Sequence, residues 1–237
     1  MRHQAIVIAV AVWAGLSPVQ YALSANPPNF IVVPGIQDPA DTDLVNALWV
    51  GGLGCPTAAR LASPSPSPYS DPACNSAHGG GDATDFDNEG LLLIKTGPTS
   101  NGPANNNALS GATLVGVQGI HLTELGYDIR AGSVCDAVAP RFDIFTMSGK
   151  YYQLHCSDSL VPPTPTPGTG WTRLRWKPTG AFKAMRVGGM LSAQPETITD
   201  PISSILIIFD EGQEPAPHSG LAILDNIDVN GRLVGKP

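Results

Sequence analysis

The sequence has little charge. Of its 237 residues, 14% are Asp, Glu, Lys or Arg, and the formal net charge is −7. In an average soluble protein roughly a quarter of the residues are charged, so a solvated disordered tail is not expected here. A negative net charge repels the phosphates of nucleic acids. The composition therefore argues against a nucleic-acid partner.

The chain also lacks the short motifs of several enzyme classes. G-x-S-x-G, H-E-x-x-H, the P-loop and G-x-G-x-x-G are all absent. Neither C-x-x-C nor H-x-x-x-H occurs, which argues against a zinc site. We therefore predict a protein that is not an enzyme and that needs no organic cofactor.

Long hydrophobic runs are missing after the amino terminus. Residues 5–16 are almost entirely apolar, follow a basic start, and precede a small-residue cleavage site at 22–25. A run of about a dozen residues is too short to span a bilayer comfortably and is typical of a signal peptide. We expect residues 1–25 to be a signal peptide and 26–237 to be one domain without a membrane span, with an uncleaved anchor as the alternative. The expected location is secreted, extracellular or cell-surface, and periplasmic in a Gram-negative cell.

Cysteine is scarce, with four residues in the chain. In an oxidising compartment these residues are expected to form two disulfides. Of the three connectivities we favour pairing between neighbours in sequence, Cys55–Cys74 and Cys135–Cys156. The first bridge would close a Pro/Ser-rich loop, and the second would join two predicted strands.

Glycine and proline are abundant, with 26 and 23 residues. Both disfavour helix interiors, so the composition argues against helix bundles and coiled coils. Short apolar segments alternate with turn residues, the pattern of an antiparallel two-sheet sandwich or a barrel with long Pro/Gly-rich loops. The expected strands cover residues 29–33, 45–50 (or a short helix), 90–95, 111–118, 120–130, 141–147, 151–156, 171–177, 181–187, 203–210 and 221–229.

Alternation within these segments predicts which side chains are buried. Leu125, Tyr127 and Ile129 share one face of their strand, which we expect to face the core. Residues 141–156 are typical of a hairpin with its turn at Ser148-Gly149. Residues 204–209 are apolar on both faces, as in a central strand covered on both sides.

One acidic residue, Asp225, lies within an apolar strand. Strict alternation places it on one face with four aliphatic residues, Leu221, Ile223, Ile227 and Val229. A buried carboxylate needs hydrogen bonds, a counter-charge or a metal. The candidates are Arg141, backbone N–H groups of a neighbouring loop, and Ca²⁺; a structural Asp that pins a loop is the alternative to a metal ligand. Asp228 is expected to face solvent.

A second acidic cluster lies in a glycine-rich segment. Asp82, Asp85 and Asp87 offer the oxygen ligands that Ca²⁺ prefers, although the EF-hand spacing is absent. The alternative is a solvated acidic loop. Calcium is therefore the cofactor that the sequence leaves open.

Aromatic and basic residues suggest a ligand site. Trp171, Arg173 and Arg175 share one face of a predicted strand, and Tyr151 could extend the surface. An exposed aromatic ring beside polar groups can stack on a sugar. The alternative is structural, with Trp176 in the core and Trp171 covering a sheet edge.

Several segments carry a resemblance to known proteins. ELGYDIRAGSVCDAVAPRFDIFTMSGKYYQLHC, WTRLRW, ILIIFDEG and LAILDNIDVNG resemble a group of uncharacterised bacterial secreted β-sandwich proteins. The ending is also similar to the last strand of galactose-binding-like jelly rolls. The resemblance covers roughly residues 120–230; it implies a jelly-roll sandwich and no enzymatic activity.

These observations predict a secreted, non-catalytic β-sandwich that binds an extracellular polysaccharide or a cell-surface glycan. A structural or self-assembling subunit of the cell envelope is an alternative from a different class, because apolar strands and low charge favour self-association. A secreted hydrolase with dispersed carboxylates is a third hypothesis.

Overall fold

The computed structural model describes residues 30–55, 89–96, 108–136, 139–158, 164–165, 170–177, 180–188, 195–210 and 219–234. Regular structure in these ranges is β-strand apart from a short 3-10 helix at Cys156–Asp158. The prediction of an all-β protein is therefore confirmed. The predicted signal peptide lies outside the described residues.

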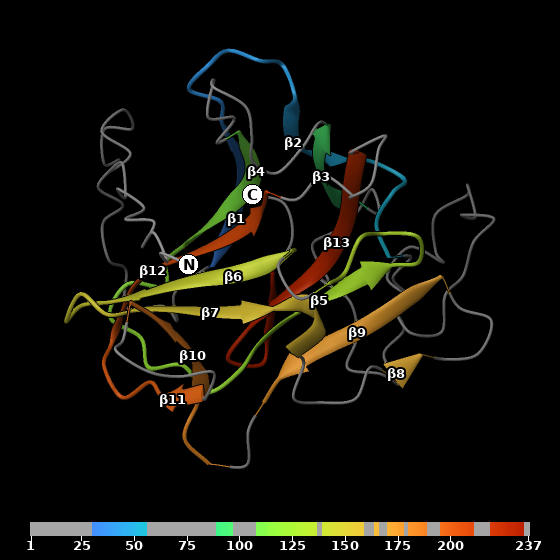
Figure 1. Cartoon of the computed structure of the whole chain (residues 1–237). Coiled ribbons are helices and arrows are strands. Elements are labelled where there is room, and N and C mark those ends of the chain that lie inside the picture. The colour runs from blue at the N-terminus through green and yellow to red at the C-terminus, as the bar shows by residue number, and fades with distance from the viewer. Residues whose placement is uncertain are drawn as a thin grey trace, which may run out of the picture.

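The described strands form two antiparallel sheets of seven strands each (Figure 1). Sheet A contains, in spatial order, β1 (Ile31–Gln37), β4 (Leu109–Val115), β12 (Ile202–Phe209), β6 (Arg141–Thr146), β7 (Tyr151–His155), β10 (Lys183–Val187) and β11 (Pro195–Thr197). Sheet B contains β2 (Val45–Val50), β3 (Gly90–Thr96), β13 (Ser219–Val229), β5 (Leu125–Arg130), β9 (Trp171–Trp176) and β8 (Thr164–Pro165), with β14 (Arg232–Val234) paired to β13.

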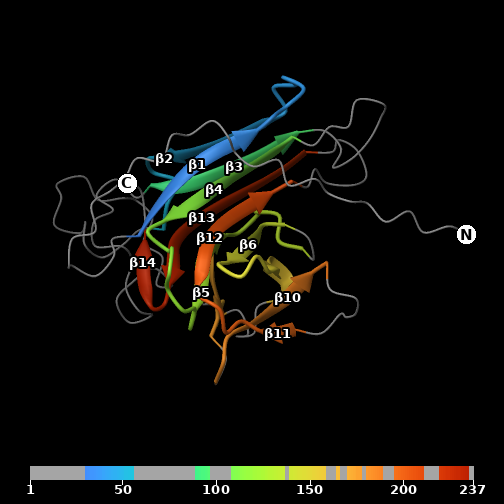
Figure 2. The same ribbon diagram turned by 90° about the vertical axis from the view of Figure 1, so that its left-hand side faces the viewer.

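The strand order is that of a jelly roll. The central strands of sheet A run β4-β12-β6-β7, and those of sheet B run β3-β13-β5-β9. The chain changes sheet at each step from β3 to β4, from β4 to β5 and from β5 to β6. The β6–β7 hairpin stays in sheet A, and the chain has returned to sheet B at β9. Figure 2 shows β4 and β12 beside β3 and β13 of the other layer. This interleaving of two Greek keys defines the jelly-roll sandwich.

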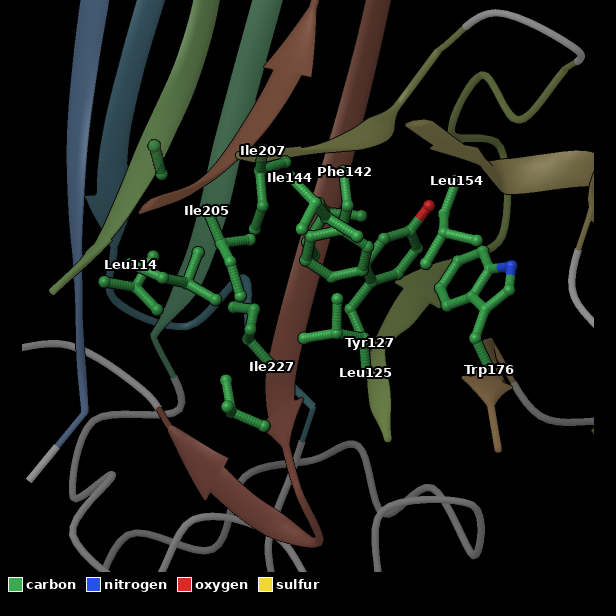
Figure 3. Close-up of a cluster of buried hydrophobic side chains, with 14 of the residues drawn as sticks. Leu114, Leu125, Tyr127, Phe142, Ile144, Leu154, Trp176, Ile205, Ile207 and Ile227 are labelled. Carbon is green, nitrogen blue, oxygen red and sulfur yellow. The ribbon is translucent and has the colours of Figure 1, made fainter. Parts of the chain in front are cut away.

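The core lies between the two sheets. Figure 3 shows Leu114, Phe142 and Ile205 of sheet A pointing towards Tyr127 and Trp176 of sheet B. The three aromatic rings form a cluster with centroid separations of 5.4, 5.5 and 5.6 Å, tilted or edge-to-face as aromatic pairs prefer. The indole N–H of Trp176 is buried without a hydrogen-bond partner in the described part of the chain. The structural alternative for Trp176 is thus confirmed.

Local sequence patterns predicted most of the strands. Val45–Val50 is a strand rather than a helix, and β12 lies between β4 and β6 as a central strand. The hairpin turn is where we expected it: the N–H of Gly149, at φ +81, donates to the carbonyl of Thr146 at 2.9 Å. The strand expected at 120–130 begins later, at Leu125.

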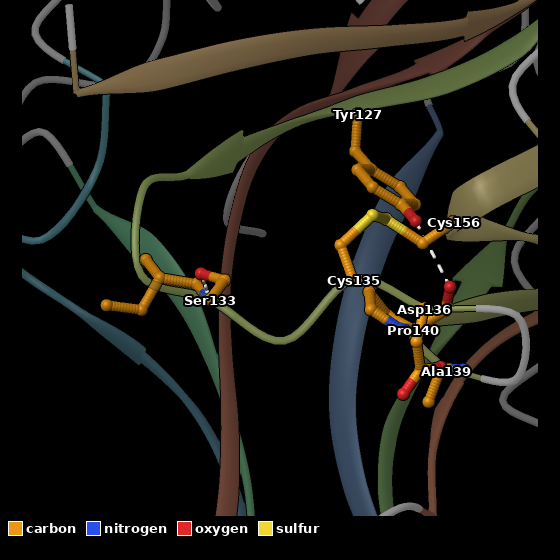
Figure 4. The surroundings of a disulfide bond; sticks show 8 residues. Tyr127, Ser133, Cys135, Asp136, Ala139, Pro140 and Cys156 are labelled. Carbon is orange, nitrogen blue, oxygen red and sulfur yellow. Dashed lines mark hydrogen bonds between the residues drawn. A yellow bond between two sulfur atoms is a disulfide. The ribbon is translucent and has the colours of Figure 1, made fainter.

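A disulfide joins Cys135 to Cys156, as predicted (Figure 4). It ties the segment before β6 to the end of β7. Cys55 is also disulfide-bonded. Cys74, its predicted partner, lies outside the described residues. No helix among the described residues is long and apolar enough to cross a membrane.

A β-bulge in β13 overturns part of the predicted alternation. The pairing of β13 with β5 shifts between Asp225 and Asp228, and Asn226 has φ +45. Asn226 and Ile227 together therefore oppose Tyr127. Asp225 does not share a face with Ile227, which packs in the core. The expectation that Asp228 faces solvent is wrong, because the bulge places Asp228 on the covered outer face of sheet B, 4% exposed.

Candidate functional site

The structure separates the residues that we predicted as one ligand platform. Tyr151 lies in β7 of sheet A, whereas Trp171, Arg173 and Arg175 lie in β9 of sheet B. The outer faces of the two sheets point in opposite directions. The predicted residues therefore belong to two different surfaces.

Trp171 is not an exposed stacking surface. Its side chain is 1% exposed and packs with Cys55 and Ile223 in a small second core on the outer face of sheet B. The described part of the segment after β2, residues 51–55, places Cys55 over this face. The expectation of an exposed tryptophan is therefore wrong, because a distant loop folds over the strand.

Arg173 and Arg175 bind a buried carboxylate. Arg173 Nε and Nη2 donate to the two oxygens of Asp128 at 2.7 and 2.8 Å. Arg175 lies 3.4 Å from Asp128 and 3.1 Å from Asp228. Burial lowers the pKa of Arg175, and the two carboxylates oppose that shift. Both guanidinium groups thus form part of an internal ion-pair network, which explains how charged residues are tolerated on this covered face.

Asp225 is held by loop backbone, one of the three partners that we considered. Its carboxylate accepts the N–H of Cys55 and the N–H of Asn226, each at 2.6 Å. Arg141 lies in the other sheet. This geometry matches the structural alternative, in which Asp225 pins a loop to the sandwich. Calcium binding at Asp225 stays a prediction.

The predicted calcium loop is outside the part of the chain that can be described. Asp82, Asp85 and Asp87 all fall there. Among the described residues, no group of three His, Cys, Asp or Glu side chains is placed to hold a metal ion.

The outer face of sheet A carries a second polar and aromatic surface. Phe145 of β6 lies directly opposite Tyr151 of β7, and the two rings stack with centroids 4.7 Å apart and planes 5° apart. Both side chains are half-buried. Directly paired positions on antiparallel strands bring side chains together on one face. The hairpin register therefore creates this aromatic pair.

A hydrogen-bond network lies beside the aromatic pair. Asp143 accepts the hydroxyl of Tyr151 at 2.8 Å and an amide N–H of Gln153 at 3.2 Å. Arg141 Nε donates to the same carboxylate at 2.9 Å. The remaining Arg141 nitrogens bind both oxygens of Asp210 at 2.7 and 2.8 Å. These side chains are thus held in fixed positions before any ligand arrives.

Burial dominates the protonation of this network. It raises the pKa of Asp143, although Arg141, Tyr151 and Gln153 oppose the shift. Burial, followed by the charge of Asp143, also raises the pKa of Tyr151 well above its ordinary value. The Tyr151 hydroxyl therefore keeps its proton at neutral pH and donates to Asp143.

We call Arg141, Asp143, Phe145, Tyr151 and Gln153 the sheet A platform. Half-buried Leu206 and Met185 and the exposed Val187 continue the same face on neighbouring strands. Tyr151 was predicted as part of a ligand surface, and the other four were not. The alternation of residues 141–147 against 151–156, on either side of the turn predicted at Ser148-Gly149, was the available signal.

Comparisons with known proteins find few matches. No family model matches the sequence, and no curated protein does. One solved structure with some likeness is a family 11 carbohydrate-binding module from Clostridium thermocellum in complex with a β-1,3-1,4-mixed-linked tetrasaccharide. The identity is 16%, the TM-score is 0.38, and the match covers 92% of this chain and 95% of that one. The strand order above, rather than this likeness, establishes the jelly roll.

Proposed function

We propose that the protein is a non-catalytic glycan-binding module and that the sheet A platform is its binding surface. The observation that carries this proposal is the stacked pair Phe145–Tyr151 beside side chains already ordered by hydrogen bonds. Sugars present apolar C–H faces and rings of hydroxyls. A surface that offers aromatic area next to fixed donors and acceptors complements both.

Preorganisation supports binding at this surface. Tyr151 is held on one side by Phe145 and at its hydroxyl by Asp143 and Gln153. Binding therefore orders few additional side chains, which limits the entropy that association costs. Within the described residues, the amide oxygen of Gln153 accepts no hydrogen bond, so it can accept one from a ligand hydroxyl.

The charges of the platform support a neutral ligand and a binding role. Arg141 contacts both Asp143 and Asp210, so the guanidinium charge is already neutralised. An anionic sugar would face two carboxylates and one paired cation. Because Asp143 is bound by three side chains, it is held as a structural acceptor rather than as a free acid or nucleophile.

An oxidising location is part of the proposal. Disulfides persist in secreted and periplasmic proteins and are rare in the reducing cytosol. The Cys135–Cys156 bridge supports a protein that acts outside the cytoplasm, where polysaccharides are its available partners.

Affinity gel electrophoresis against soluble polysaccharides tests the proposal. We expect retardation by at least one neutral polysaccharide and none by polygalacturonate. Tyr151→Ala and Phe145→Ala should each weaken binding about tenfold or more, which corresponds to about 1.4 kcal/mol, because each variant removes an aromatic ring on which the sugar would stack. Tyr151→Phe should keep part of the affinity, because the ring remains.

Ile36→Ala is the matched control. Ile36 is an exposed apolar residue of sheet A, in the edge strand β1 away from the platform. Its variant should bind as the wild type does. Failure of the wild type to bind any polysaccharide, or unchanged binding by both alanine variants of the platform, would exclude this function and favour the self-assembling or hydrolytic alternatives.

A further inference from the structure

Asp210 extends the outer face of sheet A at one end of the platform. Leu206 and Ile208 lie on this face of β12, and Asp210 comes two residues after Ile208. Ile208 pairs directly with Arg141 of β6, so Asp210 lies just beyond Arg141, at the end of the platform away from Phe145. The register of β12 and β6 therefore brings the two charged side chains together.

Asp210 holds both terminal nitrogens of Arg141. Nη1 donates to one carboxylate oxygen at 2.7 Å and Nη2 donates to the other at 2.8 Å. These two parallel bonds are the geometry in which arginine binds carboxylates most specifically. Burial lowers the pKa of Arg141, but Asp210 and then Asp143 oppose this effect, and the net shift is upward. Asp210 is therefore the main counter-charge of this guanidinium group.

The ion pair meets solvent on the Asp210 side. The side chain of Asp210 is 26% exposed, whereas that of Arg141 is 11% exposed. A molecule that approaches this end of the platform therefore meets the carboxylate before the guanidinium group. The Asp210 carboxylate occupies the place that a ligand carboxylate would need in order to bind Arg141 with two hydrogen bonds.

This end of the platform is within reach of a glycan that contacts the aromatic pair. Arg141 Nε donates to Asp143, whose other oxygen accepts the hydroxyl of Tyr151. Arg141 and Phe145 are four residues apart in β6, which corresponds to about 13 Å along the strand. An oligosaccharide that stacks on the aromatic pair and follows β6 therefore contacts Asp210, whereas a single sugar does not reach it.

We propose that Asp210 is a specificity-determining residue, which makes the platform select neutral glycans and reject sugars that carry a carboxylate. The proposal rests on the glycan-binding function proposed above. Asp210 takes the place of a ligand carboxylate, because it satisfies Arg141 and presents a negative charge to the ligand. A uronic acid at this position would lie against a like charge and would lose solvation without gaining an ion pair.

Removing the Asp210 side chain should open a site for a carboxylate. Asp210→Ala vacates the place next to the terminal nitrogens of Arg141. In affinity gel electrophoresis we expect this variant to bind polygalacturonate about tenfold or more tightly than the wild type does, because a uronate can now form the two charged hydrogen bonds. Asp210→Ala/Arg141→Gln should lose this gain.

Acetate is a probe of the same place that requires no sugar. Replacing sodium chloride by sodium acetate, at the same pH and ionic strength, should raise the melting temperature of Asp210→Ala and leave that of the wild type unchanged. Asp210→Ser vacates most of the same space and replaces Asp210→Ala if that variant does not fold. If neither variant folds even in acetate, Asp210 is a structural residue and the proposal is overturned.

Two control variants separate the vacated place from the lost charge. Asp210→Asn removes the same charge but keeps the place filled, so it should not respond to acetate. Asp41→Asn removes one negative charge between β1 and β2, where Asp41 is exposed and has φ 53, a backbone conformation that Asn tolerates. It should leave both measurements unchanged. Equal gains in either control would overturn the proposal, since net charge would then explain them.

The outcomes also distinguish this proposal from the glycan-binding function. Failure of the wild type to bind any polysaccharide would exclude that function whatever the Asp210 variants do. A wild type that binds a neutral polysaccharide, together with a folded Asp210→Ala protein that gains no polygalacturonate binding, would overturn the role of Asp210 alone. A response of Asp210→Ala to acetate without a gain for polygalacturonate would have the same meaning, because a glycan would then not reach this end of the platform.

Discussion

Asp128 and Asp225 lie directly opposite each other on β5 and β13, and each is 1% exposed. Two buried like charges at paired positions repel each other strongly unless each is compensated. The structure compensates them differently: Asp128 binds the guanidinium of Arg173, and Asp225 binds the backbone N–H groups of Cys55 and Asn226. One carboxylate therefore holds a strand pair together, and the other holds a loop on the outer face of sheet B.

Removing Asp128 should destabilise the protein strongly. Asp128→Ala leaves Arg173 and Arg175 on a covered face without their shared carboxylate, and the amide of Asn226 loses an acceptor at 2.9 Å. Breaking one side of a buried ion pair typically costs about 3–5 kcal/mol. Urea unfolding followed by tryptophan fluorescence measures the loss.

Asp225→Asn is the matched comparison for Asp128→Ala. The amide oxygen can still accept the N–H of Cys55, but the amide NH2 then faces the N–H of Asn226, which loses its acceptor. Because the repulsion between the two carboxylates also disappears, the loss of stability should be smaller than that of Asp128→Ala. Equal losses in the two variants would contradict the division of roles between the two carboxylates.

Gly126 makes room for Arg175 and should not tolerate a side chain. A Cβ at this position would lie 2.5 Å from the carbonyl oxygen of Leu174 and 2.4 Å from Cδ of Arg175. We expect Gly126→Ala to lower the free energy of unfolding by about 3 kcal/mol, at the upper end for overpacking.

The contact with the carbonyl oxygen of Leu174 allows a control variant. In the double variant Gly126→Ala/Arg175→Ala the arginine clash is gone, but the contact with Leu174 remains. Its stability should therefore stay well below that of Arg175→Ala alone. A Gly126→Ala protein as stable as the wild type would show that β5 and β9 can separate without cost.

Local patterns in the sequence were enough to predict the sandwich. The alternation around Tyr127 identified the core face of β5, and the hairpin at Ser148-Gly149 depends on neighbours in sequence. The Cys135–Cys156 bridge follows from the same local arrangement, because the two cysteines flank the hairpin. Features that short segments determine by themselves were therefore predictable.

Features that depend on contacts between residues far apart in the sequence were not predictable in this way. The sequence predicted, as one alternative, that Asp225 pins a loop, but it did not show which loop. Asp225 and Cys55 are 170 residues apart, and nothing near Cys55 shows that this segment covers sheet B. That cover buries Trp171 and makes the predicted exposed platform wrong. The bulge at Asn226 reverses the face of every later residue in β13, so a strict two-residue period misplaced Asp228.

The disulfide should contribute measurably to stability. The cysteines of the bridge are separated by 21 residues, and closing a loop of this size stabilises by about 3 kcal/mol in the chain-entropy model. We expect the Cys135→Ala/Cys156→Ala variant to lose that amount in urea unfolding. If the bridge does not form in the folded protein, the wild type and the variant will unfold at the same urea concentration.

The raised pKa of Asp143 predicts how the platform responds to pH. Because burial raises the pKa of this carboxyl in the folded state, the native protein binds its proton more tightly than the unfolded chain, where the pKa is about 3.9. The stabilising contribution is complete below the unfolded pKa and is lost as pH rises through the folded pKa. Acidification from neutral pH should therefore stabilise the wild type relative to Asp143→Asn.

Thermal melts of the two proteins from pH 7 to pH 4 measure this difference. Asp228→Asn should give the same sign, since burial also raises the pKa of Asp228. Asp200→Asn should give the opposite sign, because the bond to Lys150 lowers the pKa of Asp200 and its contribution is lost as pH falls. A difference between wild type and Asp143→Asn that shrinks on acidification would mean that Arg141, rather than burial, dominates the Asp143 carboxyl.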